Sequence, residues 1–228
     1  LPGFITPAQV QERTVAENLP EPPASAVTTQ PSNRARLAIV IDDWGYPSPY
    51  SAEFLSMDIP LTAAVIPHET VSYFIWLLDQ LKPNKILEVG TAIGFSASIF
   101  AEYTEAKIQT IERNPEMIER AKANFEDFGL TDRVEILEGQ AGEWLEKLPA
   151  DTFDFIFMDS AKAKYYDFFP DCMRILQTDG VLAVDDVLQG GTILQPTEEI
   201  PRRVRKIHKK LNAFLEVVLD HPALISTI

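Results

Sequence analysis

Short apolar runs of strand length alternate with segments of helical period from about residue 69 onward. The expected strands are 85–89, 107–111, 133–137, 153–158 and 181–185, and the expected helices lie near 69–81, 94–103, 115–128, 141–147 and 164–176. Strands that are joined through helices connect by right-handed crossovers and lie parallel, with helices on both faces of the sheet. The alternation therefore predicts a doubly wound α/β domain with a mostly parallel sheet.

The first third of the chain lacks this alternation. Residues 1–36 are rich in proline and small polar residues, which is typical of a linker or disordered arm. Residues 37–41 form a short apolar run closed by Asp42 and Asp43, and residues 61–66 are a further candidate strand. We therefore divide the chain into an arm (1–36), a short fragment (37–67) and the α/β domain (68–228).

Composition and charge exclude several classes of protein. The formal net charge of −14 argues against broad, non-specific binding to nucleic acid, because such a surface repels phosphate. Cys172 is the single cysteine, which excludes an internal disulfide framework and fits a reducing compartment. No apolar run approaches the roughly 18 to 20 residues of a membrane span, and no intact secretory signal is present. We therefore expect a cytoplasmic protein that does not enter a membrane.

The densest motif is EVGTAIGFS, residues 88–96, where an expected strand ends and a helix begins. Glycines there allow the backbone to approach a ligand, and a helix N-terminus offers free N–H groups to an anionic part of it. Glu112 ends the next strand, where doubly wound sheets place an acid that binds ribose hydroxyls. The alternative is a plain tight turn, but residues 138–141 and 159–162 bring further polar groups to the same edge of the sheet.

Three aspartates are expected at that edge as well. Asp159 closes the fourth strand, and Asp185 with Asp186 closes the fifth, its neighbour in such a sheet. Buried carboxylates repel one another unless a cation lies between them. An all-oxygen set suits Mg²⁺, or alternatively Mn²⁺ or Ca²⁺. The pattern predicts a metal site, and a pair of turn or helix-cap acids is the alternative for Asp185 and Asp186.

Residues 65–228 resemble the metal-dependent class I O-methyltransferases of the catechol and caffeoyl-CoA type, particularly the small bacterial members. The resemblance rests on ILEVGTAIGFSA, the acid at Glu112, FMDSAK and VDDVLQGG. It implies S-adenosylmethionine as the cofactor and an in-line transfer of its methyl group to a hydroxyl of a metal-chelated acceptor. The cofactor contacts that it implies are Glu88, Gly90, Thr91, Gly94, Ser96, Glu112, Gly139, Ala141 and Asp159, with Gly139 and Ala141 bordering the adenine.

The same resemblance assigns roles at the expected metal site. It implies that Asp159, Asp185 and Asp186 ligate the metal and that Asp159 and Lys162 are the catalytic residues. Lys162 would serve as general base or as electrostatic partner of the acceptor hydroxyl, and an ordinary exposed lysine is the alternative. Many family members carry asparagine where this chain has Asp186, so the extra negative charge is a departure from the family pattern.

Six basic residues crowd one stretch of an otherwise acidic chain: Arg202, Arg203, Arg205, Lys206, Lys209 and Lys210. Apolar residues recur there at helical spacing, which predicts an amphipathic helix with a basic outer face. A solvated helix surface is one interpretation, and attraction of an anionic acceptor such as RNA or a CoA ester is the other. Some bacterial relatives methylate a hydroxylated uridine in tRNA and others methylate catechol-like small molecules, so both acceptor classes stay open.

Residues 37–67 resemble the opening of the divergent polysaccharide deacetylase family, through IDDWGY and the proline-rich stretch before it. In that family the paired aspartates serve a metal-dependent hydrolase site, which here would use Asp42 and Asp43. The resemblance suggests a fused or chimeric chain. A hydrolase fragment and a non-catalytic protein that binds S-adenosylmethionine are therefore the alternatives to a methyltransferase.

The C-terminus allows a single further strand, residues 224–228. Class I methyltransferases close their sheet with two final strands, the last running antiparallel between the fifth and the sixth. We therefore expect the 224–228 strand to leave a gap, to slide next to the fifth strand, or to fray. Each outcome exposes an apolar edge, which favours aggregation or a homodimer.

Overall fold

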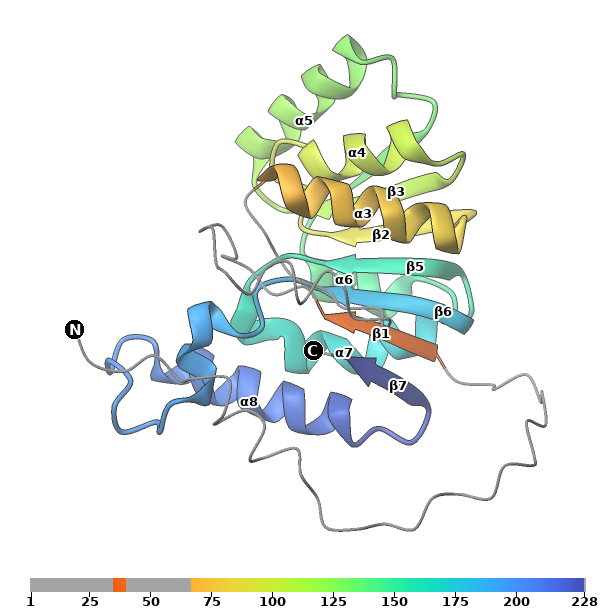
Figure 1. Cartoon of the computed structure of the whole chain (residues 1–228). Helices are drawn as coiled ribbons and strands as arrows, with labels where there is room; N and C mark the ends of the chain where they lie inside the picture. Colours follow the sequence, from red (N-terminus) through yellow and green to blue (C-terminus); the bar gives the residue numbers. More distant parts are fainter. Residues whose placement is uncertain (1–34, 40–66, 228) are drawn as a thin grey trace, which may run out of the picture. The chain divides into compact units, whose positions relative to one another are not determined.

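The computed structural model describes residues 35–39 and 67–227, in which strands and helices alternate as expected (Figure 1). The strands are β1 (Ala35–Ile39), β2 (Lys85–Val89), β3 (Lys107–Glu112), β4 (Val134–Glu138), β5 (Phe153–Met158), β6 (Leu176–Val184) and β7 (Leu224–Thr227). The helices are α3 (Pro67–Leu81), α4 (Phe95–Tyr103), α5 (Pro115–Asp127), α6 (Ala141–Lys147), α7 (Tyr165–Ile175) and α8 (Arg205–Leu219), with 3₁₀ turns η1 (Lys162–Lys164) and η2 (Gln189–Leu194). The predicted α/β fold is confirmed.

The strands form one seven-stranded sheet in the order β4-β3-β2-β5-β6-β1-β7, and every neighbouring pair is parallel. β6 begins earlier than the expected residue 181, because Leu176 already pairs with Phe153 ahead of a register shift. The order reverses between β2 and β5, and ligands bind at the carboxyl ends of the strands at such a switch point. The topology thus places the expected site residues at one edge.

Side chains alternate between two cores, one on each face of the sheet. On β5, Phe155 and Phe157 pack with α3, α4 and α5, whereas Ile156 and Met158 pack with α6, α7 and α8. The four rings of Phe74, Phe100, Phe155 and Phe157 meet edge to face in the first core. A strand buried on both faces reads as a continuous apolar run, which explains the sequence FDFIFM of β5.

The C-terminal strand differs from its expectation. β7 neither frays nor pairs with β6, because β1 lies between them and pairs in parallel with both (Figure 1). The described residues contain no antiparallel strand at this position. The physical reason is that β1 presents hydrogen-bonding groups along both of its edges, so it satisfies β6 and β7 together.

Several expectations fall on other parts of the chain. Residues 1–34 of the expected arm (1–36), the candidate strand 61–66, and Asp42 and Asp43 lie outside the described residues. The boundaries at residues 36 and 67 stay a prediction, although β1 spans the first of them and lies in the sheet. Among the described helices, none is long and apolar enough to cross a membrane.

Candidate active site

The loop from β2 to α4, residues 90–94, is fixed to the neighbouring strand by backbone hydrogen bonds. The amides of Gly90 and Thr91 both donate to the Ile111 carbonyl oxygen, at 3.1 and 3.2 Å. The Gly94 amide closes the turn by donating to the Thr91 carbonyl oxygen at 2.8 Å. The loop therefore lies across the carboxyl ends of β2 and β3, directly before the N-terminus of α4.

Gly90 and Gly94 of this loop lack room for a side chain and also have a positive φ. Gly90 has φ +114, and a Cβ there would stand 1.8 Å from the carbonyl oxygen of Asp159. Gly94 has φ +85, and its Cβ would stand 2.6 Å from the ring of Phe125. Side chains rarely adopt such a φ, so the sequence pattern reflects a tightly packed turn that brings backbone close to the end of β5.

Glu112 is held at the end of β3 by three backbone amides. Its carboxylate accepts hydrogen bonds from Ala92 N at 3.0 Å and from Arg113 N and Asn114 N at 2.8 Å each. Because one of these donors belongs to the glycine loop, the carboxylate connects that loop to the turn before α5. The side chain is half-buried, at the carboxyl edge of the sheet.

Glu88 lies beneath the loop and is fully buried. Its carboxylate accepts hydrogen bonds from the hydroxyls of Ser96 and Thr110, and the Thr110 hydroxyl also lies 2.6 Å from that of Thr91. Burial raises the pKa of Glu88 to about 7, against the opposing effect of the two hydroxyl donors. These contacts make Glu88 a buried support of the loop, joined to β3 and α4.

The end of β4 forms the next part of the edge. Gly139 has φ +137 and donates its amide to the Glu112 carbonyl oxygen at 2.8 Å. The indole N–H of Trp144 donates to the Glu138 carbonyl oxygen at 3.1 Å, which holds the ring beside Gly139. Ala141, half-buried, begins α6 directly after this turn.

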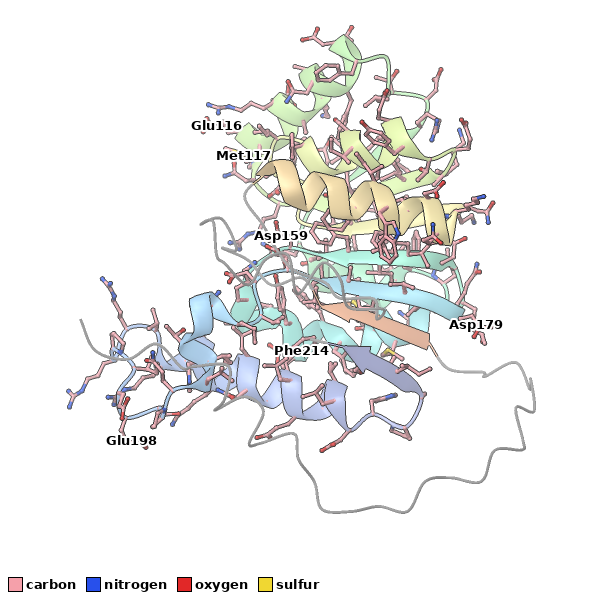
Figure 2. The ribbon with its side chains drawn as sticks, viewed as in Figure 1. Glu116, Met117, Asp159, Asp179, Glu198 and Phe214 are labelled. Carbon is pink, nitrogen blue, oxygen red and sulfur yellow. The ribbon has the colours of Figure 1, made fainter. Side chains whose placement is uncertain are left out.

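The ends of β5 and β6 bring three carboxylates around one ammonium group. Lys162 Nζ lies 3.0 Å from Asp159 Oδ1, 3.4 Å from Asp185 Oδ2 and 3.9 Å from Asp186 Oδ2. The backbone sets this arrangement, because Asp159 N donates to Val89 O and Asp185 N to Met158 O, each at 3.0 Å. Figure 2 labels Asp159 at this carboxyl edge and Asp179 at the opposite end of β6.

Asp186 has φ +49, in the left-handed region. Aspartate and asparagine are the residues other than glycine that enter this region most readily. The side chain of Gln189 donates to the Asp186 carboxylate and, at 3.1 Å, to its carbonyl oxygen. The positive φ therefore suits either an aspartate or an asparagine at this position. The two differ in charge, which the backbone conformation does not decide.

The model of the O-methyltransferase family matches residues 52–220 of this chain. The chain belongs to the O-methyltransferase family. The match covers every described element except β1 and β7, so the glycine loop, Glu112, Lys162 and the three carboxylates all lie within it.

Curated and solved relatives agree with the family. The chain is 28% identical over 172 residues to a catechol O-methyltransferase of Mycobacterium tuberculosis, which covers 72% of this chain and 76% of the relative. It is 27% identical over 133 residues to a caffeoyl-CoA O-methyltransferase of Stellaria longipes, covering 55% of each. The SAH-bound Podospora anserina methyltransferase PaMTH1 superposes with a TM-score of 0.60 at 29% identity, covering 67% of this chain and 69% of that one. The protein is thus an S-adenosylmethionine-dependent O-methyltransferase.

The ammonium of Lys162 is charged in this O-methyltransferase. Burial alone would lower the pKa of Lys162, but Tyr165 and the carboxylates of Asp159 and Asp185 outweigh it and hold the pKa above its ordinary value. Burial raises the pKa of Tyr165, and the neighbouring Lys162 ammonium opposes this effect. Lys162 Nζ lies 5.5 Å from the centroid of the Tyr165 ring. Only 18% of the Lys162 side chain is exposed. The alternative of an ordinary exposed lysine is therefore wrong.

The donor set suits a hard divalent cation in chemistry, because all of its atoms are carboxylate oxygens. The positions of these oxygens do not by themselves form a metal cage, since the described residues contain no group of three or more His, Cys, Asp or Glu side chains that could hold an ion. The carboxylates meet Lys162 Nζ instead. A divalent cation at this site of the O-methyltransferase would therefore compete with that ammonium for the same oxygens.

Three residues that complete the site were not predicted from the sequence: Thr110, Ser160 and Gln189. Ser160 Oγ is buried with no hydrogen-bond partner among the described residues, so it can pair with a polar atom of a bound group. Its backbone amide donates to the Tyr165 hydroxyl at 3.3 Å. Ser160 and Gln189 both lie inside the quoted motifs, which was the available signal. Nothing in the sequence marks Thr110 as a partner of Glu88.

Proposed function

We propose that this O-methyltransferase methylates a hydroxyl of an acceptor that is chelated by a divalent cation, with Asp159, Asp185 and Asp186 as ligands. The observation that carries the proposal is the convergence of these three carboxylates on one cationic atom, at 3.0, 3.4 and 3.9 Å. Two adjacent strands supply them, so the sheet itself fixes their spacing. Carboxylates so close together need a counter-charge, which an ammonium or a metal ion provides.

The cofactor lies, in this proposal, along the edge from the glycine loop to the end of β4. Glu112 binds the ribose hydroxyls, since its carboxylate is already oriented by three amides. Gly139 and Ala141 border the adenine, where the absence of a large side chain leaves room beside Trp144. Glu88 and Ser96 act from beneath the loop, because the Ser96 hydroxyl is turned toward the buried carboxylate.

Asp159, Lys162, Asp185 and Asp186, together called the acid edge, then position the acceptor oxygen for in-line attack on the methyl group. Lys162 lies between the ends of β5 and β6, where it either accepts the hydroxyl proton or pairs with the negative charge that develops on oxygen. A divalent cation, when bound, lowers the pKa of the acceptor hydroxyl. Most of the rate enhancement comes from holding the reacting atoms in line at close contact.

A catechol-like small molecule is the proposed acceptor, because vicinal hydroxyls chelate a cation and relatives of this chain are named for catechol and caffeoyl-CoA.

An anionic acceptor such as a hydroxylated tRNA uridine is the second candidate. The basic surface formed by residues 202–210 favours it. Arg205 donates to the carbonyls of Ile200 and Glu198, and Lys210 pairs with Asp167 at 2.7 Å. The remaining four basic side chains are exposed, namely Arg202, Arg203, Lys206 and Lys209.

The metal can be tested with two matched aspartate variants. Asp186→Asn removes a charge from the acid edge, whereas Asp179→Asn removes one from the far end of β6, and both positions have positive φ. We expect methylation of a catechol acceptor to require Mg²⁺ or Mn²⁺, and Asp186→Asn alone to raise the cation concentration needed for half-maximal rate. Full turnover of the unaltered protein in excess chelator would overturn the proposed metal role.

The acceptor class can be tested by competition between a catechol and RNA that carries the hydroxylated uridine. A double change, Lys206→Ser with Lys209→Ser, should leave catechol methylation unchanged in either case. If RNA is the acceptor, the same change lowers its methylation and flattens the dependence of its binding on salt. RNA methylation that is insensitive both to the double lysine change and to salt would exclude a role of the basic surface.

A further inference from the structure

Ala92 lies in the glycine loop, residues 90–94, and has φ +46, in the left-handed region. The Cβ of an alanine is crowded in that region, so the conformation is strained, whereas glycine adopts it freely. The side chains of Ala92 and Ile93 are both exposed, so their packing contributes little to holding the turn. A strained backbone persists only where surrounding contacts fix it. The turn therefore depends on hydrogen bonds to its backbone.

Two such hydrogen bonds hold the turn from opposite sides of the strained residue. The amide of Ala92 donates to Glu112 Oε2 at 3.0 Å. The side-chain amide of Asn124 donates to the carbonyl oxygen of Ile93 at 2.8 Å. Glu112 ends β3 and Asn124 lies in the C-terminal half of α5, so one strand and the helix that follows it supply both partners.

α5 also packs directly against the loop beside Asn124. A Cβ on Gly94 would stand 2.6 Å from the ring of Phe125 and 3.5 Å from the Cβ of Ala121, and both of these residues are buried. Residues that are three and four apart on a helix are neighbours on its surface, so Asn124 lies beside them. The packed helix therefore places the Asn124 amide within reach of the Ile93 carbonyl.

We infer that Asn124 is a positioning residue for S-adenosylmethionine. Its hydrogen bond, together with that of Glu112, keeps Ala92 in the strained conformation and thereby presets the loop for the cofactor. Without it, the strain at Ala92 shifts the turn toward other conformations, which the cofactor must reverse when it binds, so its affinity falls. The inference rests on the proposed placement of the cofactor at this loop.

Asn124→Ala tests the inference when the full chain is titrated with S-adenosylmethionine in a calorimeter. Alanine is the best helix former, so the change should not weaken α5 itself. We expect the affinity to fall about threefold to tenfold, the scale of one net hydrogen bond. Asn84→Ala is the matched control and should bind normally, because the Asn84 side chain donates to Asp154 at 3.2 Å, ahead of β2 and away from the loop.

Ala92→Gly, added to Asn124→Ala, tests whether strain is the cause. Glycine adopts a positive φ without strain, so the turn should depend less on the Asn124 bond. We expect the second change to restore the affinity to within about twofold of the unaltered protein. If Asn124 acted only on the stability of α5, a change in the loop would not reverse its loss.

Two results would overturn the inference: an unchanged affinity of Asn124→Ala, or a loss of affinity that Ala92→Gly does not restore. Glu112→Ala, titrated in parallel, separates this inference from the proposed function. A loss of affinity in Glu112→Ala without one in Asn124→Ala would keep the cofactor at the loop and exclude only the role of Asn124. Absence of binding by the unaltered protein would contradict both.

Discussion

Gly90 of the loop 90–94 lies directly against the backbone of Asp159, so that a Cβ on Gly90 would stand 1.8 Å from the Asp159 carbonyl oxygen. The loop that begins α4 and the acid edge are therefore in contact through backbone rather than through side chains. The Asp159 amide adds to this by donating to Val89, the residue before Gly90, at 3.0 Å. Any displacement of one part moves the other.

Gly90→Ala should consequently destabilise the protein more than the strain of a positive φ alone would. Gly129→Ala is the control, because Gly129 also has positive φ, +66, but its Cβ would meet nothing within 4 Å. We expect the control to lower the free energy of unfolding by about 1 kcal/mol, from strain alone. Gly90→Ala should cost at least about 3 kcal/mol in urea unfolding and reduce binding of S-adenosylmethionine. Equal effects of the two changes would contradict this contact.

Glu112→Ala should weaken the binding of S-adenosylmethionine by about 1.5–3 kcal/mol in calorimetry, the scale of hydrogen bonds to a charged group. The change also frees the amides of Ala92, Arg113 and Asn114, so the glycine loop should loosen. Glu116→Ala, at an exposed acid in the first turn of α5, serves as control and should bind normally. Undiminished affinity of Glu112→Ala would remove Glu112 from the cofactor site.

Glu88 should make stability depend on pH. Its folded-state pKa lies above the ordinary value of 4.5, at about 7, so the folded protein holds the proton more tightly than the unfolded chain. The protonated Glu88 contributes about 3 kcal/mol to the free energy of unfolding. This contribution is complete below about pH 4.5 and is lost as the pH rises through 7. Glu88→Gln should abolish this pH-dependent part of the free energy of unfolding. Urea unfolding of both proteins from pH 5 to 8 measures it as the difference between their two profiles. Parallel profiles would show that Glu88 does not titrate in this range.

Lys162→Met should separate metal binding from catalysis. Without the ammonium, the three carboxylates lose their counter-charge, so a divalent cation should bind roughly tenfold more tightly or better. Turnover should nevertheless fall by about 10²-fold or more, the usual scale for loss of a group that handles a proton or charge. Lys164→Met is the control, since Lys164 is exposed and pairs with Asp167 at 3.3 Å. Weaker Mn²⁺ binding by Lys162→Met, measured by electron paramagnetic resonance, would contradict the competition.

Sequence alone determined the α/β fold and the edge at which the site lies. Strands buried on both faces carry apolar runs, and helices carry their own period, so β2, β5 and α6 were predicted with the observed bounds. Because parallel strands all end at the same edge, the residues after each strand could be assigned to one place. Glu112, Asp159 and Asp185 followed from that rule without knowledge of any contact.

Only the tertiary structure decided how these groups are paired. Lys162 meets the carboxylates of Asp185 and Asp186 as well as that of nearby Asp159. Glu88 meets Thr110 on the neighbouring strand as well as Ser96, so both groupings depend on contacts between residues that are distant in sequence. The position of β1 has the same origin. A five-residue apolar segment has no preferred partner by itself, and its place between β6 and β7 depends on two edges that exist only after the rest of the sheet has formed.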